Sequence, residues 1–303
     1  MSDFLPDAHK KKLDEYGFKD DAAKSWLSTA WRRFRRHRLA LVGAVVIIVL
    51  YSVAVLAPWI APYDPVSDIF VARRLEGPSL QHPFGLDEVG RDLLSRVIWG
   101  SRISLAVGFV AAGVSLVLGV VLGALAGYFG GFIDSLIMRM VDLLMAIPQF
   151  LLIIAIVAAV GPNFLNIILV IGATGWAHYA RVTRGEFLSL RNEEFVEAAK
   201  AAGASTSRII FYHILPNSMA PIIVLATLNV AGAVLLETAL SFLGFGVQPP
   251  TASWGSILAP GRQYLRRAAH IATFPGLAIT MTVLAFNLAG DGLRDALDPK
   301  MQL

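Results

Sequence analysis

The sequence predicts an all-α polytopic membrane protein with six transmembrane helices. Of its 303 residues, 56% are hydrophobic and only 16% are charged, whereas soluble globular domains carry about 25% charged residues. The mean hydropathy of +0.63 is typical of a chain whose surface lies largely in lipid. Six apolar stretches approach the roughly 20 residues that a helix needs to cross a bilayer. They span residues 39–60, 103–127, 136–160, 164–180, 218–241 and 272–290.

The chain begins with a polar, basic segment that ends in Trp31-Arg32-Arg33-Phe34-Arg35-Arg36-His37-Arg38. We expect residues 1–38 to form a cytoplasmic tail next to membrane lipid, and not a nucleic-acid site. The stretch 39–60 is longer than the apolar core of a cleavable signal peptide, so we predict an uncleaved first helix. Residues 61–100 are rich in proline and charge, and they are predicted to form an extracytoplasmic loop.

The helical core is predicted to span residues 101–291, with 292–303 as a short C-terminal tail. A stripe of small residues recurs every fourth position in the second apolar stretch, and small residues allow helix backbones to approach closely in lipid. We interpret it as a packing seam rather than a transport path lined by glycine. The stripe consists of Ala111, Ser115, Gly119, Gly123, Gly127 and Gly131.

Ionisable residues and prolines interrupt the apolar stretches of the core. Arg139 and Asp142 lie three residues apart in the third stretch, so they are predicted to neutralise each other on one helix face. Glu237 lies near the outer end of the fifth stretch. It can either make structural hydrogen bonds or lie at the outer mouth of a transport pathway, and the sequence does not decide between these two roles. These three are the candidate pathway or gate residues. Pro148 and Pro221 predict kinks.

The distribution of Lys and Arg predicts the orientation. With six spans, the N-terminal segment, the loop after the fourth stretch and the C-terminus share one side, which holds 17 of these residues. The opposite side holds eight, and Arg139 lies within a stretch. The positive-inside rule therefore places both termini and that loop in the cytoplasm. The fourth stretch is short, but an even number of spans requires it.

The cytoplasmic loop 192–216 carries a regular pattern. It reads Glu193-Glu194-Phe195-Val196-Glu197-Ala198-Ala199-Lys200-Ala201-Ala202-Gly203, followed after nine residues by His213-Ile214-Leu215-Pro216. Asn192 is a suitable N-cap, Glu197 and Lys200 can pair, and Gly203 can end a helix in the left-handed conformation. Ser205 can cap a second helix, which Pro216 is predicted to stop or bend.

One face of the first predicted helix in this loop is small and apolar, because Phe195, Ala198, Ala199 and Ala202 follow helical spacing. Interfacial helices that lie on lipid usually present larger side chains such as Leu and Trp. A mostly alanine face therefore favours insertion into a protein partner.

This loop resembles the EAA loop of the membrane-spanning subunits of bacterial ABC importers, whose usual form is Glu-Ala-Ala, three residues, Gly, nine residues, Ile-x-Leu-Pro. His213 replaces the usual Ile, and the other fixed positions match. The stretches 82–105, 241–255 and 284–300 are similar to the second, C-type permease of the dipeptide, oligopeptide and nickel group. Leu86 replaces the usual Thr there, and no consequence follows from that exchange.

The resemblance implies a type I ABC importer transmembrane fold in a bacterial inner membrane. It implies a homologous second permease, two ATPase subunits that bind ATP and Mg, and an extracytoplasmic solute-binding protein that delivers peptides. It also implies that the loop is a coupling helix docked on an ATPase. The coupling residues it implies are Glu197, Ala198, Ala199, Lys200, Gly203, Arg208, Leu215 and Pro216.

Several chemistries are absent from the sequence. There is no cysteine, which excludes disulfides and thiolate metal sites. No Gly-Lys dipeptide occurs, so there is no Walker A loop, and neither a Gly-x-Ser-x-Gly nor a His-Glu-x-x-His motif is found. We therefore expect no catalytic site and no cofactor on this chain. A secondary transporter, or a permease for a nickel chelate, glutathione or an opine, is the alternative.

Overall fold

The computed structural model describes residues 31–297, so most of the predicted tail 1–38 lies outside the described residues. The described chain is helical apart from turns, loops and two isolated β-bridges between residues 69 and 92. The predicted all-α class is confirmed. The α-helices are α3 (Arg38–Ile60), α4 (Leu93–Phe129), α5 (Gly131–Ala146), α6 (Gln149–Val160), α7 (Phe164–Leu190), α8 (Glu194–Ala201), α9 (Thr206–Arg208), α10 (Leu215–Phe242), α11 (Trp254–Gly261) and α12 (His270–Leu297). The described chain also has three segments of 3-10 or π helix: η1 (Val71–Arg73), η2 (Ile209–Ile214) and η3 (Arg262–Tyr264).

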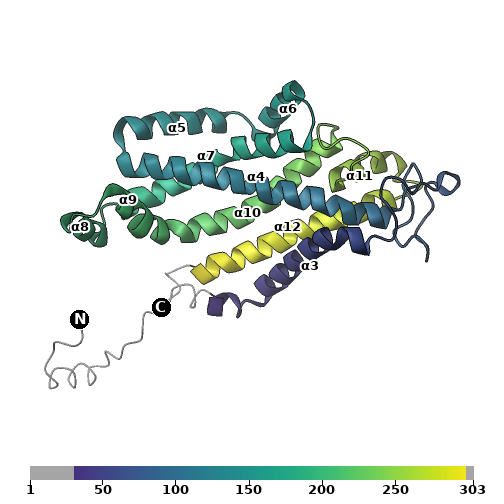
Figure 1. Ribbon diagram of the computed structural model, residues 1–303, viewed down its shortest axis with the longest axis horizontal. Helices are drawn as coiled ribbons and strands as arrows, with labels where there is room; N and C mark the ends of the chain where they lie inside the picture. The colour runs from purple at the N-terminus through teal and green to yellow at the C-terminus, as the bar shows by residue number, and fades with distance from the viewer. Residues whose placement is uncertain (1–30, 298–303) are drawn as a thin grey trace, which may run out of the picture.

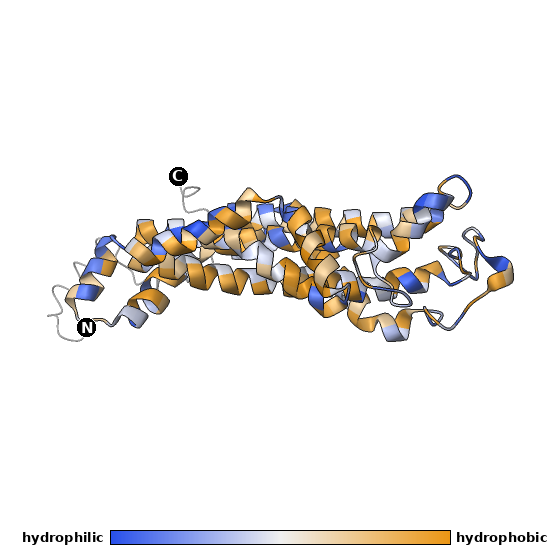
Figure 2. Ribbon diagram, turned by 90° about the horizontal axis from the view of Figure 1, so that it is seen from above, coloured by the Kyte–Doolittle hydropathy of each residue, from blue (hydrophilic) through white to orange (hydrophobic). Residues whose placement is uncertain are grey.

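The five longest helices, α3, α4, α7, α10 and α12, run along the long axis of the molecule (Figure 1). The loop after α3 lies with α11 at one end of this bundle, and α8 and α9 lie at the other end. The start of α3 and the end of α12 are at the α8 end, where His37 Nε2 lies 3.6 Å from an Asp295 carboxylate oxygen. Hydrophobic residues cover the length of the bundle (Figure 2). The described parts of the three segments predicted to share one side therefore lie at one end.

Four helical units of the described chain are long and apolar enough to cross a membrane: α3, α4, α12 and the continuous segment Thr206–Phe242 that contains α10. The predicted third span is wrong as a single helix. It is broken into α5 and α6, which meet at an angle of 89° and add a fifth span if they are taken together. Pro148 explains the break, because its ring disfavours helical backbone at Ile147, which is extended (φ −99°, ψ 131°).

The remaining predicted span, 164–180, corresponds to α7, which extends ten residues further to Leu190. It carries Arg181, Arg184 and Glu186, and it is not among the helices that are apolar enough to be counted as spans. Likewise α12 continues through Leu297, beyond the expected start of the C-terminal tail at residue 292. Pro221 lies within α10 without interrupting it, unlike Pro148.

The predicted packing seam is confirmed between α4 and α7. A Cβ added to Gly119 would lie 2.6 Å from the carbonyl oxygen of Trp176, and one added to Gly123 would lie 2.5 Å from that of Ala180. Further along, Ser115 Oγ donates a hydrogen bond of 2.9 Å to a carbonyl oxygen of α7. The seam ends at Gly127, because Gly131 begins α5 in open space. Backbones approach this closely only where side chains are missing.

The loop between α3 and α4 is fixed by buried carboxylates. Asp92 caps α4 by accepting a 2.8 Å hydrogen bond from the backbone N–H of Ser95, and its other oxygen contacts His82 Nδ1 at 2.9 Å. Asp87 accepts hydrogen bonds from three backbone N–H groups and from the Arg91 guanidinium. Burial and the neighbouring Asp87 charge raise the pKa of Glu88. This end of the bundle is therefore closed by an ordered polar cap.

Candidate functional site

Residues 194–214 form an exposed elbow between α7 and α10, which we call the elbow throughout. Its first helix, α8, begins after Glu193, so the predicted N-cap Asn192 is wrong by one residue. Glu193 adopts the extended conformation of an N-cap (φ −72°, ψ 150°), although no side chain completes the cap. Gly203 has φ +78°, as predicted for a left-handed residue that ends the helix.

The second part of the elbow differs from the expected short helix. After Ser205 there is a single turn, α9, and then the π-helical segment η2, which leads into α10 without a break. Pro216 lies in the first turn of α10, where a missing N–H is tolerated, so it neither stops nor bends the helix. The wider π turn accommodates the change of hydrogen-bond register just before this proline. His213, the position that departs from the family pattern, lies in this π segment.

The elbow is anchored to the bundle by one side chain of α8. Val196 is fully buried in a cluster with Phe187 at the end of α7, Ile209 and Ile214 of η2, and Ala124 of α4. Leu215, one of the implied coupling residues, packs at the edge of the same cluster. Three helices of the bundle and the elbow therefore share one apolar contact.

Hydrogen bonds reinforce this anchor. Lys200 Nζ lies 2.8 Å from Glu197 Oε1, as predicted, and also donates to the carbonyl oxygen of Arg191 at 3.3 Å. The Arg191 guanidinium in turn donates to the carbonyl oxygen of Gly127 at the end of α4, at 3.1 Å. The elbow is thus linked to the end of α7 through Lys200, and Arg191 links that end to α4.

The outer face of the elbow is uncovered. Phe195 is 40% exposed, Ala198, Ala202 and Arg208 are exposed, and Ala199 is half-buried. The apolar face predicted from the spacing therefore points away from the bundle. An uncovered apolar strip on a firmly anchored helix is a surface suited to a protein partner.

The predicted ion pair between Arg139 and Asp142 is wrong. The Asp142 carboxylate accepts a 2.7 Å hydrogen bond from Arg181 of α7 instead. A second pair, between Asp134 and Arg184, joins the same two helices. The reason is that α5 packs beside α7, which brings guanidinium groups across to the carboxylates of α5. Arg139 is exposed.

Glu237 makes the structural hydrogen bonds that were one of its two predicted roles. It is fully buried, and its carboxylate accepts hydrogen bonds from Ser104 of α4 at 2.9 Å and Ser241 at 2.7 Å. Ser104 Oγ also accepts the backbone N–H of Trp254 at 3.2 Å. Glu237 therefore connects α4, α10 and α11.

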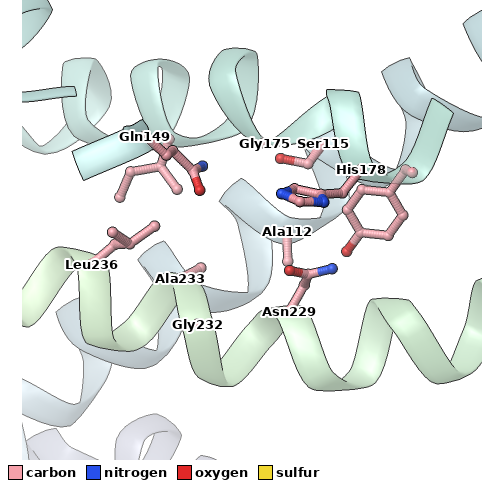
Figure 3. A pocket seen from close by; sticks show the side chains of 11 residues that line it. Ala112, Ser115, Gln149, Gly175, His178, Asn229, Gly232, Ala233 and Leu236 are labelled. Carbon is pink, nitrogen blue, oxygen red and sulfur yellow. The ribbon is translucent and has the colours of Figure 1, made fainter. Parts of the chain in front are cut away.

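A polar cavity that the sequence did not predict lies near the middle of the bundle. Its volume is about 250 Å³, and it is lined by residues of α4, α7, α10 and the start of α6. Figure 3 shows Gln149 and His178 on one side of this space and Asn229 on α10 opposite them. It is lined by Ala112, Ser115, Gln149, Ile171, Gly175, His178, Tyr179, Asn229, Gly232, Ala233 and Leu236. The sequence held one sign of this cavity: the stretch 164–180, which contributes His178 and Tyr179 to the lining, is less apolar than the other predicted spans.

A membrane-spanning helical bundle with a polar cavity inside and an anchored, uncovered elbow at one end defines a transmembrane transport subunit. Residues 119–303 match the family model described as "Binding-protein-dependent transport system inner membrane component". Residues 25–82 match the model of the N-terminal transmembrane domain of oligopeptide transport permease C. The chain belongs to this family of ABC importer permeases.

Similar proteins agree with the family. The chain is 45% identical over 284 residues to the glutathione transport system permease protein GsiD of Escherichia coli, covering 94% of each chain. It is 45% identical over 273 residues to the dipeptide transport system permease protein DppC of Alkalihalophilus pseudofirmus, covering 90% of each. Among solved structures, a chain of the MetNI methionine ABC transporter has the same fold at 20% identity, with a TM-score of 0.54 over 68% of this chain and 96% of that one.

Proposed function

We propose that this permease imports short peptides, driven by two ATPase subunits, one of which docks on the elbow. The observation that carries the proposal is the contrast within α8: Val196 is fully buried while Phe195 and Ala198 on neighbouring positions are uncovered. One side of the helix is thus fixed to the bundle and the other is free to bind. ATP and Mg would be bound by the partner subunits, and this chain would supply no catalytic group.

In this proposal, movement of the ATPases reaches the bundle through the cluster around Val196. A displaced α8 pushes on Phe187 of α7 and on Ile214, which precedes α10. Closure of the ATPases then switches the bundle between inward-facing and outward-facing states, with each state selected by its own contacts. The implied coupling residues Glu197, Lys200 and Arg208 lie on the uncovered part of the elbow.

A second, homologous permease would complete the path. Three charged residues are exposed on the surface of α5 and α7: Arg139, Asp142 and Arg181. Charged side chains at membrane depth are costly in lipid, so they face a protein or a water-filled space. This supports a partner subunit on that face. With the broken α5–α6 pair and α7 counted as one span each, the chain would cross the membrane six times. An even number of spans would leave both termini on one side, and the charge distribution supports the cytoplasm as that side.

Peptides are the solute that the relatives support. GsiD is named for glutathione and DppC for dipeptides, and both of these solutes contain amide bonds. A binding protein on the extracytoplasmic side would deliver the solute to the polar cap formed by the loop 61–92. A nickel chelate or an opine remains the alternative solute, and a secondary transporter the alternative mechanism.

The test is uptake by the complex purified with its native partners and reconstituted into liposomes. We expect ATP-dependent uptake of a labelled dipeptide by the wild type, and its loss in Glu197→Lys and Gly203→Pro with normal insertion. Gly203→Pro fails because φ +78° is inaccessible to proline. Asp291→Lys makes a matching charge reversal on α12 and should leave uptake intact. Normal uptake by both elbow variants, or uptake without ATPase partners, would refute the proposal.

A further inference from the structure

We propose that the polar cavity between α4, α6, α7 and α10 is a binding subsite for the amide groups of the peptide in transit. This inference rests on the proposed function. The cavity lies near the middle of α4, α7 and α10 along their lengths, since Ser115, His178 and Asn229 are all close to the centre of their helices. A solute that crosses the bundle on this side has to pass that level.

The chemistry of the lining selects neutral polar groups. None of the residues that line the cavity is Asp, Glu, Lys or Arg, so no charged partner is available for a peptide terminus. Gln149, His178, Tyr179 and Asn229 instead offer hydrogen-bond donors and acceptors among apolar residues. An amide N–H and C=O would satisfy such groups, whereas an unpaired charge would lose its hydration without compensation.

Tyr179 brings a further polar group to the cavity. The residue is 1% exposed and lines the cavity, and its hydroxyl group interacts with the side chain of Asn229. A hydroxyl group can donate one hydrogen bond and accept others, so beside Asn229 it can still bind a solute amide as a second partner. Ser115 and Asn229 themselves donate to the carbonyl oxygens of Gly172 and Leu225.

A second cavity of about 200 Å³ shares Gln149 and His178 with the first. It lies beneath the break between α5 and α6, where Ile147 and Pro148 form part of its lining. These two polar side chains therefore stand between two adjacent spaces. An extended chain with repeated amide bonds can contact both spaces, whereas a compact solute fills only one. The arrangement accordingly favours a peptide backbone over a compact chelate.

The experiment compares two dipeptides, glycylglycine and glycylsarcosine, whose amide nitrogen is methylated and cannot donate a hydrogen bond. Turnover is measured in liposomes with the complete complex, saturating binding protein and saturating peptide. The ratio of variant to wild-type turnover cancels any preference of the binding protein between the peptides. The variants are Gln149→Leu and Asn229→Leu. The control, Gln263→Leu, makes the same change on exposed η3, away from the cavity.

We expect at least one cavity variant to slow glycylglycine turnover by about two- to tenfold, the factor that corresponds to one hydrogen bond. The same variant should slow glycylsarcosine markedly less, and Gln263→Leu should slow neither. Equal slowing of both peptides, or none, in complexes that assemble normally would overturn the subsite. If the wild type takes up neither the two dipeptides nor glutathione with ATP, the proposed function fails and the subsite fails with it. Failure of the subsite alone is recognised by normal wild-type uptake together with the absence of a selective effect in the cavity variants.

Discussion

The seam between α4 and α7 makes a sharp prediction about Gly123. Replacing this residue by alanine adds one methyl group, which would lie 2.5 Å from the Ala180 carbonyl oxygen and 2.8 Å from Thr183 Cβ. Ordinary contact begins at 3.4 Å, so the two helices would have to separate locally by close to 0.9 Å. The nearest obstacle is backbone, which cannot rotate away. Overpacking of this kind typically costs about 1–3 kcal/mol.

Gly113 provides the matched control for Gly123 on the same helix. A Cβ added there meets nothing within 4 Å. Gly113→Ala should therefore be neutral or stabilising, because alanine is favoured over glycine in a helix by about 0.5–1 kcal/mol. The assay is the thermal unfolding midpoint of the purified chain in detergent, together with the amount that assembles with its partners. Equal midpoints for the two variants would refute the interpretation of the stripe as a close-packed seam.

Further predictions concern buried carboxylates and the outer cap. Glu237→Gln should keep most of the stability and Glu237→Ala should lose about 1–3 kcal/mol, because the hydroxyl donors lose their buried acceptor; unfolding midpoints measure both. Asp92→Ala should cost about 0.5–2 kcal/mol or more through the lost helix cap, while Asp92→Asn should cost less. The pKa of Glu88 is raised on folding by burial and by Asp87, so its ionisation disfavours the folded loop. Wild-type stability should fall, relative to Glu88→Gln, as the pH rises from the normal Glu pKa through the raised one. A stability difference between the wild type and Glu88→Gln that does not change with pH would contradict this prediction.

The sequence predicted the features that depend on local rules. The helical class follows from composition, the seam from four-residue spacing of small side chains, and the Glu197–Lys200 pair from helical geometry. The left-handed Gly203 follows from the absence of a Cβ atom. Each of these needs only the chain's own neighbourhood, and each is found in the structure.

The errors arose where a distant segment decides the outcome. Asp142 had a suitable partner three residues away, but α7 passes close enough to place Arg181 in better contact. The steepness of the bend at Pro148 depends on where α6 packs, which local sequence does not specify. The cavity could not be found because its polar residues come from four helices, and only His178 and Tyr179 are neighbours in the sequence.

The geometry of α7 connects the two candidate sites. Phe187 contacts the elbow through the cluster around Val196, and His178, nine residues earlier, lines the cavity. At 1.5 Å per residue these positions are about 14 Å apart on one continuous helix. Between them and beyond, α7 is held against α4 at a seam without side-chain slack, and Gly119 packs against the backbone of Trp176. A displacement of the elbow therefore cannot be absorbed locally and has to shift α7 as a unit along the seam. In the proposed mechanism, that shift changes the cavity wall formed by His178 and releases the peptide amide.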